Sequence, residues 1–205
     1  MHPNKAIFWK EKSVLILSDL HLGKAAHFRK YGIPIPSQIH SEDMMRLYSL
    51  IKTFSPTKII IVGDLFHSDY NDEWNMFESL VISLPQTNFH LIKGNHDLLD
   101  DHIYDKTVQC FDELEIKPFS FVHDPEKSTS GLYAICGHIH PSISIKAKGR
   151  QNMRVSCFYF SEKFGVLPSF GNFTGNYKIS FKLGDLVYLI VDDQIVPYKP
   201  AFYMD

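Results

Sequence analysis

Residues 59–67 have the sequence Ile-Ile-Ile-Val-Gly-Asp-Leu-Phe-His, in which four branched aliphatic residues precede a glycine and an aspartate. A continuous apolar run of this kind is typical of a parallel strand that is buried on both faces. The carboxylate of Asp64 would follow the end of that strand, where its burial is unfavourable unless a positive charge compensates it. We predict that Asp64 lies between two metal ions and that other polar segments complete their sites.

The composition limits the class of protein. Cys110, Cys136 and Cys157 are odd in number and form no Cys-x-x-Cys pair, which favours a reducing compartment over a disulfide scaffold or a structural zinc finger. No apolar run approaches membrane-spanning length and no secretory leader is visible, so we expect a cytoplasmic protein with no membrane partner. The formal net charge is -2, so any binding to nucleic acid would depend on local charge.

The length limits the domain organisation. A chain of 205 residues can bury a sizeable hydrophobic core, and we expect it to form one domain that spans residues 1–205. The sequence contains no internal repeat, low-complexity segment or linker. The tail from about residue 198 is either disordered or docked through Phe202 and Tyr203.

The order of the predicted elements in the first half of the chain indicates an α/β fold. Buried strands are expected at residues 13–17, 59–62 and 88–92, because apolar residues run continuously there. Between them, apolar residues at helical spacing predict helices at 41–54 and 74–84. A repeated strand–helix–strand order predicts parallel strands joined by helical crossovers.

The second half of the chain has a different pattern. Two short apolar segments, 119–122 and 132–136, predict further strands that each lead into histidines. Beyond them, residues 143–160 alternate around a basic turn, and residues 187–196 alternate around Asp192-Asp193. Alternation of this kind predicts two antiparallel hairpins.

Polar clusters follow five of the predicted strands. The carboxyl ends of parallel strands share one edge of a sheet, so we expect these side chains to meet there. A single Asp or Asn at a strand end is more often a loop cap, but five clusters in succession favour a site. The set contains oxygen and imidazole donors without a thiolate, which suits two divalent ions such as Mn²⁺, with Fe²⁺ or Zn²⁺ as alternatives. Its members are Asp19, His21, Asp64, Asn95, His96, His123, His138 and His140.

These clusters resemble the motif series of the calcineurin-like metallophosphoesterases. The resemblance is carried by Asp-Leu-His at 19–21, Gly-Asp-Leu-Phe-His at 63–67, Gly-Asn-His-Asp at 94–97, His123, and Gly-His-Ile-His at 137–140. It implies an α/β fold of the metallophosphoesterase type, a four-layer sandwich in which two central mixed β-sheets are flanked by helices.

The same resemblance implies a role for each residue. The first metal ion would be bound by Asp19, His21, Asp64 and His140. The second ion would be bound by Asp64, Asn95, His123 and His138. His96, oriented by Asp97, would act as general acid or stabilise the transition state; a histidine beside a carboxylate can be tuned near neutral pH.

A narrower resemblance points to the ligase-associated DNA-damage-response endonuclease branch of that family. Residues 24–34, 63–67 and 167–175 carry it. It implies a Mn²⁺-dependent nuclease or phosphodiesterase that prefers single-stranded DNA and is associated with a DNA ligase and a helicase.

Basic residues near the expected site are candidates for substrate binding. Lys24, Arg29 and Lys30 follow two expected ligands directly, so they either contact phosphates that flank the scissile one or form a solvated loop. His67 either braces the Asp64 loop, contacts substrate or is an ordinary loop residue. A second basic cluster has the same two interpretations, and consists of Lys146, Lys148, Arg150 and Arg154.

The sequence therefore predicts a dinuclear metal-dependent phosphodiesterase. We expect a hydrolase that cleaves phosphodiester bonds in DNA, an endonuclease linked to DNA repair, through attack by a metal-bridging hydroxide. The alternative is a small-molecule phosphatase or cyclic-nucleotide phosphodiesterase, which would have a closed pocket in place of an open basic track. A metal-free protein-binding scaffold is disfavoured because the ligand set is complete.

Overall fold

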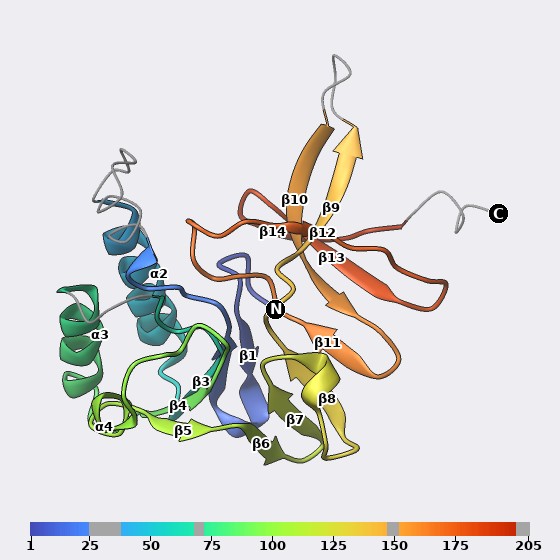
Figure 1. Cartoon of the computed structure of the whole chain (residues 1–205). Coiled ribbons are helices and arrows are strands. Elements are labelled where there is room, and N and C mark those ends of the chain that lie inside the picture. Colours follow the sequence, from blue (N-terminus) through green and yellow to red (C-terminus); the bar gives the residue numbers. More distant parts are fainter. Residues whose placement is uncertain (25–37, 68–71, 147–151, 200–205) are drawn as a thin grey trace.

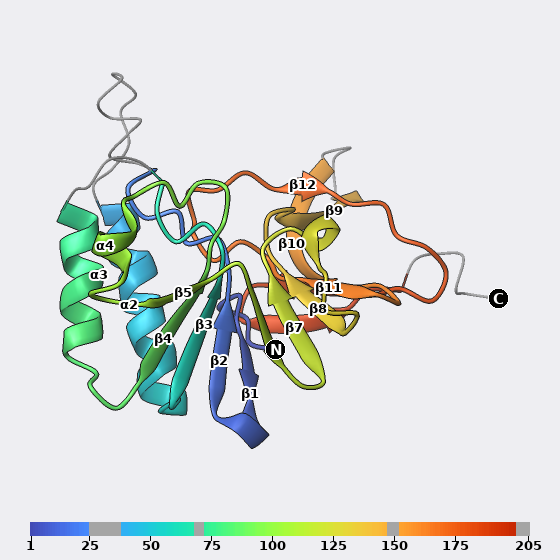
Figure 2. The same ribbon diagram turned by 60° about the horizontal axis from the view of Figure 1, so that its bottom comes forward.

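A computed structural model of the chain describes residues 1–24, 38–67, 72–146 and 152–199, without the side chains of 38–41, 72 and 146. The first half forms a five-stranded sheet in the order β1-β2-β3-β4-β5 (Figures 1 and 2). Strands β2 to β5 are parallel, and β1 pairs with β2 in the antiparallel sense. The strands are β1 (Ile7–Trp9), β2 (Val14–Leu17), β3 (Lys58–Val62), β4 (Asn88–Ile92) and β5 (Gln109–Phe111).

Helices cover one face of this first sheet, as Figure 2 shows. They are α2 (Gln38–Phe54), α3 (Asp72–Ile82) and the short α4 (Asp101–Tyr104), and a 3₁₀ turn η1 (Lys10–Lys12) joins β1 to β2. Ile59 and Ile61 of β3 pack in the cluster that includes the helices. No helix in the described ranges is both long and apolar enough to cross a membrane.

The opposite face of the first sheet packs against a second, nine-stranded sheet. Ile60 and Val62 of β3 contact this side, in a cluster with Phe121 and Phe158 of the second sheet. Because successive strand residues point to opposite faces, a continuous aliphatic run is what a strand between two apolar layers requires. The segment 59–62 is therefore buried on both faces, as its sequence predicts.

The second sheet is mixed, with the order β12-β9-β10-β11-β8-β7-β6 and the hairpin β13–β14 attached to β10. Strand β8 is parallel to both β7 and β11, whereas β9 and β10 form an antiparallel hairpin. The strands are β6 (Glu113–Ile116), β7 (Phe119–Val122), β8 (Tyr133–Cys136), β9 (Pro141–Lys146), β10 (Asn152–Phe160), β11 (Phe164–Val166), β12 (Tyr177–Lys178), β13 (Leu186–Val191) and β14 (Gln194–Pro197). A 3₁₀ turn, η2 (Pro125–Lys127), lies between β7 and β8.

The structure confirms the expected α/β class with two mixed sheets and helices packed against them. Strands β1, β5, β11 and β12 were not predicted, because segments of two or three residues are too short to show a period. Strand β6 (Glu-Leu-Glu-Ile) was not predicted either, since it lacks the continuous apolar run of β2 or β8. The basic turn of the β9–β10 hairpin and the tail with Phe202 and Tyr203 lie outside the described residues. Tyr198 packs edge-on against Phe181, with 5.8 Å between ring centroids.

Candidate metal centre

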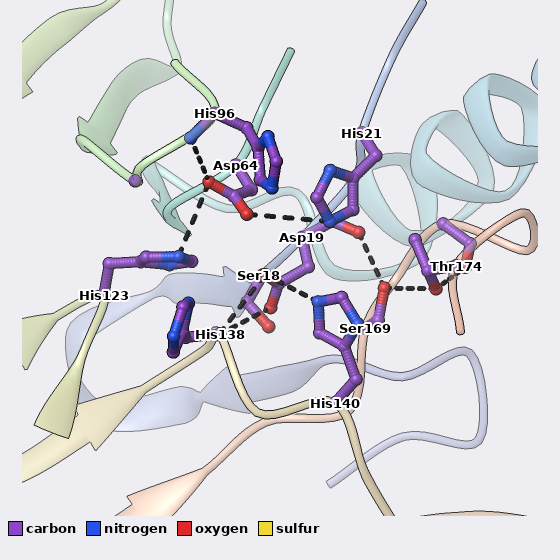
Figure 3. Close-up of polar contacts among 12 residues, drawn as sticks. Ser18, Asp19, His21, Asp64, His96, His123, His138, His140, Ser169 and Thr174 are labelled. Atoms are coloured by element: carbon purple, nitrogen blue, oxygen red, sulfur yellow. Dashed lines mark hydrogen bonds and ion pairs between the residues drawn. The ribbon is translucent and has the colours of Figure 1, made fainter. Parts of the chain in front are cut away.

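The expected site residues lie in loops at the carboxyl ends of β2, β3, β4, β7 and β8. The first two loops are joined through their backbones: Asp19 N–H donates to the Gly63 carbonyl at 3.0 Å, and His21 N–H donates to the Asp64 carbonyl at 2.9 Å. The two sheets thus present their strand ends to one centre, which Figure 3 shows in close-up. The predicted gathering of these loops is confirmed.

Asp64 lies between two histidines that come from different sheets (Figure 3). Its Oδ1 is 3.5 Å from Nε2 of His123, and its Oδ2 is 3.7 Å from Nε2 of His21. Oδ1 also accepts a hydrogen bond of 3.0 Å from the backbone N–H of His96. The residue is only 2% exposed, so its charge depends on these neighbours for stabilisation.

Asp19 forms the second buried carboxylate of the centre. Its Oδ1 is 3.0 Å from Nε2 of His140, and its two oxygens accept the backbone N–H of His138 at 3.3 and 3.2 Å. Asp19 is common to two groups whose ligand atoms lie within 4.8 Å of one another: Asp19 with His21 and His140, and Asp19 with Asp64 and His123. Asp19 thus lies close to candidate ligands of both groups, as Asp64 lies close to both His21 and His123. The sequence alone did not indicate this position of Asp19.

Two of the histidines are oriented by backbone carbonyls. Nδ1 of His123 contacts the Val62 carbonyl at 3.1 Å, and Nδ1 of His140 contacts the Gly175 carbonyl at 3.0 Å. A carbonyl oxygen only accepts, so Nδ1 must carry a proton in both rings and Nε2 is the nitrogen that faces the carboxylates. Carbonyl contacts of this kind are typical of histidines that bind metals.

The electrostatics of the site fit a cation. Both ring nitrogens of His21 are buried without a hydrogen-bond partner among the described residues, and burial lowers the pKa of His21 to about 3. Its ring is therefore neutral at neutral pH and offers a lone pair. Burial acts to lower the pKa of His123, but the contact with Asp64 outweighs it and raises this pKa to about 9. Without metal, a protonated His123 would thus compensate Asp64.

The backbone at the centre is strained. A left-handed conformation is unfavourable for residues other than glycine, by about 1–2 kcal/mol each. Five expected ligands adopt it nonetheless, and strain that clusters in this way is typical of functional sites. These are Asp19 (φ 54°), His21 (φ 49°), Asp64 (φ 49°), His138 (φ 65°) and His140 (φ 50°).

Glycines that precede the ligands allow the close packing of the centre. A Cβ on Gly63 would overlap the ring of His123, and one on Gly94 would overlap the carboxylate of Asp64. A Cβ on Gly137 would lie 2.6 Å from Oδ2 of Asp19. The sequence carries this signal as Gly-Asp, Gly-Asn and Gly-His pairs, but only the structure shows which side chain occupies each space.

His96 and its neighbours line the same centre. The His96 ring centroid is 5.5 Å from that of His21 and 4.3 Å from that of His67, so His67 lies within the site. Asp97 accepts hydrogen bonds from the backbone N–H groups of Phe66 at 3.0 Å and Gly94 at 2.8 Å. Asp97 therefore contacts loop backbone, and its role in orienting the His96 ring stays a prediction.

The remaining expected residues divide into three kinds. Asn95 is exposed and lines a hollow with His123. Lys24 lies near the centre: burial lowers its pKa, and the charges of Asp64 and Asp19 act to raise it. Arg29 and Lys30 lie outside the described residues.

The loop at 167–175 has a positioning role that the sequence did not reveal. The hydroxyl of Ser169 and the N–H of Gly171 both donate to the Asp19 carbonyl, at 2.9 and 3.0 Å. The N–H of Phe170 donates to the Ser18 carbonyl at 2.8 Å. These hydrogen bonds come from residues about 150 positions later in the sequence, and they hold Asp19 in its left-handed conformation.

The fold and the site together define the class of protein. Residues 12–197 match the family of calcineurin-like phosphoesterases, so the chain belongs to that family and is a metal-dependent phosphoesterase. The resemblance found in its motifs is therefore confirmed. No curated protein matches the chain significantly.

Solved structures give further comparisons. The chain is similar to the nuclease MPE of Pseudomonas putida, with 27% identity and a TM-score of 0.81 over 97% of this chain and 94% of that one. It is also similar to Yfce, a phosphoesterase from E. coli, with 12% identity and a TM-score of 0.43 over 90% of this chain and 96% of that one.

Proposed function

We propose that this phosphoesterase is a dinuclear nuclease that hydrolyses phosphodiester bonds in single-stranded DNA. One observation carries the proposal: two buried carboxylates, Asp19 and Asp64, lie among imidazole rings whose Nε2 atoms face them. Two buried negative charges are unfavourable unless cations compensate them. Oxygen and imidazole donors suit borderline and hard divalent ions, so the donor set fits two such ions.

Seven side chains would bind the two ions. Asp19, His21, Asp64 and His140 would hold the first, and Asp64, Asn95, His123 and His138 the second. The position of Asp64 between His21 and His123 supports its role as the shared ligand. Asp19 lies close to members of both groups and is a second candidate for sharing.

The protein itself would orient the reactants and supply a proton. When bound, the two ions would hold the scissile phosphoryl group and make water a better nucleophile at neutral pH. The His96 ring lies beside the ligand His21, where its proton could reach the leaving oxygen. Its backbone N–H holds Oδ1 of Asp64, so the catalytic ring and the shared ligand are fixed by the same loop.

The substrate class is supported by similarity. The likeness to the P. putida nuclease, over nearly the whole of both chains, supports nucleic acid as substrate. A preference for Mn²⁺, endonucleolytic cleavage in DNA repair and association with a DNA ligase and a helicase rest on the motif resemblance. We also propose a reducing, cytoplasmic setting, since all three cysteines are free.

The proposal is tested with metal-depleted protein. Mn²⁺ should restore cleavage of single-stranded DNA more effectively than Mg²⁺, because imidazole ligands bind Mg²⁺ weakly. The substrates compared are single-stranded DNA, duplex DNA, RNA and bis-p-nitrophenyl phosphate. Asp64→Ala should lose bound metal and turnover together, whereas Asp100→Ala, whose side chain is 82% exposed, should retain both.

Two results would contradict the proposal. Full activity in the metal-depleted protein would exclude the metal centre as the catalytic device. Hydrolysis of a cyclic nucleotide or a phosphomonoester, without cleavage of any polymer, would favour the small-molecule phosphatase or phosphodiesterase.

A further inference from the structure

Tyr177 places an exposed aromatic ring next to the candidate metal centre. The residue is 68% exposed, although large aromatic side chains are usually buried for most of their area. Tyr48 on α2 is also exposed, at 44%, but the ammonium group of Lys52 lies over its ring at 5.4 Å. No ring or cation of the described residues lies over Tyr177, so its face is open to a ligand.

The backbone of Tyr177 is fixed to the strand that follows His140. Its N–H donates to the His140 carbonyl at 2.9 Å, and its carbonyl accepts from the Ser142 hydroxyl at 2.9 Å. Two residues earlier, the Gly175 carbonyl contacts Nδ1 of His140 at 3.0 Å. The segment that orients a candidate metal ligand therefore also sets the position of the tyrosine.

Tyr177 and the metal centre share one hollow. It is lined by His138, Ile139, His140, Gly175, Asn176 and Tyr177. A ligand that enters this hollow can therefore contact the tyrosine and two candidate metal ligands at once. A phosphate at the metal centre and a ring attached to it would occupy neighbouring positions.

A positive charge is fixed at the same segment. Nη1 of Arg154 donates to the Asn176 carbonyl at 2.9 Å, and the Ser156 hydroxyl donates to Oδ1 of Asn176 at 3.3 Å. A guanidinium held here is available to a phosphate on the same strand. The ring of Tyr177 and a cation held at the preceding residue suit single-stranded nucleic acid, since bases stack on aromatic rings and phosphates need positive charge.

We propose that Tyr177 is a stacking platform for one unpaired base of single-stranded DNA, next to the scissile phosphate. The inference rests on the proposed nuclease function and adds a determinant of strand preference to it. In duplex DNA each base already stacks between its neighbours, so its face is not available to the tyrosine. The platform therefore selects unpaired strands, while the metal centre acts on any phosphodiester that reaches it.

The test compares two oligonucleotides of equal length, one with bases and one in which abasic residues replace them throughout. The readout is the ratio of kcat/KM on the first to kcat/KM on the second. In Tyr177→Ala this ratio should fall by about 5- to 150-fold, the range expected when one base–aromatic stack is lost. Tyr177→Phe and Tyr177→Trp should keep the parental ratio because a ring remains.

Two controls separate the possible failures. Tyr48→Ala removes an exposed tyrosine from α2 and should leave the ratio unchanged. Metal content is measured in every variant, because an effect that acts through His140 would lower metal binding and activity on both substrates alike. A parental ratio in metal-loaded Tyr177→Ala would overturn the platform and leave the nuclease proposal intact. Failure of the parental protein to cleave either oligonucleotide would overturn the nuclease function itself.

Discussion

The carboxylate of Asp97 accepts a hydrogen bond of 3.0 Å from the backbone N–H of Phe66, and so joins the loop after β4 to the loop after β3. Its other oxygen accepts the N–H of Gly94 at 2.8 Å within its own loop. Asp64 and Asn95 lie on the two loops that are joined in this way. The relative position of these two candidate ligands therefore depends on a side chain that is not itself a candidate ligand.

Asp97→Asn should destabilise the protein and weaken metal binding. Only the oxygen of the amide can accept, so one of the two N–H donors would face an NH₂ group and lose its partner in a buried site. An unsatisfied buried donor reduces the free energy of unfolding by about 1–3 kcal/mol. Chemical denaturation and metal titration measure the two effects. Asp100→Asn changes an exposed carboxylate and serves as control; equal stability of Asp97→Asn and the parent would contradict the bridging role.

His96→Ala should keep both metal ions and slow the chemistry. The contact of His96 with Asp64 is made by the backbone N–H, which alanine retains, whereas the ring beside His21 is lost. Loss of a general acid reduces the rate by about 10²- to 10⁴-fold. Metal content and single-turnover rates measure the two quantities in the same sample. Cleavage at the parental rate by a metal-loaded His96→Ala would rule out its assigned role; His102→Ala changes an exposed histidine as control.

The sequence predicts which loops meet at the candidate site, because parallel strands that end at one edge bring these loops together. Buried strands can be recognised from aliphatic runs such as 59–62, and parallel strands bring the residues that follow them to one edge. His123 could be placed in this way although its motif is a single residue, because it directly follows β7. Local apolar patterns, and the rule that parallel strands end at one edge of a sheet, are therefore sufficient to predict which loops meet.

The parts that were missed depend on contacts between distant segments. Nothing near Ser169 in the sequence shows that its hydroxyl holds the carbonyl of Asp19. The left-handed backbone of Asp19 and His140 has no local signal either, since glycine, the usual residue in that conformation, is absent at both positions. Tyr177 has no signal in the sequence, because β12 is only two residues long.

Gly94→Ala should disrupt the centre without adding a charge or removing a ligand. The new Cβ would lie 2.5 Å from the backbone nitrogen of Asp64 and would overlap its carboxylate, so Asp64 would have to move. We expect metal affinity to fall about 10- to 100-fold, as for other losses of ligand support. Gly175→Ala is a matched control, because a Cβ there meets nothing within 4 Å although the residue adjoins His140. Equal metal binding by both variants would show that the packing at Gly94 is not needed.

Glu113→Gln should remove an acid-dependent contribution to stability. Burial acts to raise the pKa of Glu113, but hydrogen bonds from Thr129 and Ser128 outweigh it and lower this pKa from 4.5 to about 2. Because the pKa of Glu113 is lower in the folded state than in the unfolded state, its ionised carboxylate stabilises the fold. This stabilisation is fully present above pH 4.5 and is lost as the pH falls toward about 2. The difference in thermal stability between parent and variant should therefore shrink across that range.

The matched control for this titration is Glu115→Gln, an exposed position on the same strand β6. At neutral pH the loss of thermal stability should be smaller for Glu115→Gln than for Glu113→Gln. The reason is that Glu113 accepts three hydrogen bonds from the 128–129 turn. A stability difference for Glu113→Gln that stays constant from neutral pH down through this range would contradict the assignment. The turn matters for the site because Glu113 and Thr129 line the same hollow as Asn95 and His123.

Arg46→Lys should reduce catalysis from a position on α2. The Arg46 guanidinium donates to the Phe170 carbonyl and to Oδ1 of Asn172 at 2.8 Å, pairs with Asp43 at 2.8 Å, and lies 4.3 Å from the centroid of the Phe170 ring. A lysine has one charged nitrogen and cannot make this planar set of contacts. The loop at 167–175 would loosen, and with it the hydrogen bonds that hold the Asp19 carbonyl.

We expect the free energy of unfolding of Arg46→Lys to fall by about 1–3 kcal/mol, as for the loss of other charge-assisted hydrogen bonds. Metal affinity and kcat should fall with it, because the left-handed backbone of Asp19 depends on Ser169 and Gly171. Lys52→Ala changes a cation near an exposed tyrosine on the same helix and should alter neither quantity. Arg46→Lys could instead lose stability while its metal affinity and kcat stay at the parental values. That result would show that Asp19 is held by its own loop after β2. The contact between α2 and the 167–175 loop would then contribute to stability alone.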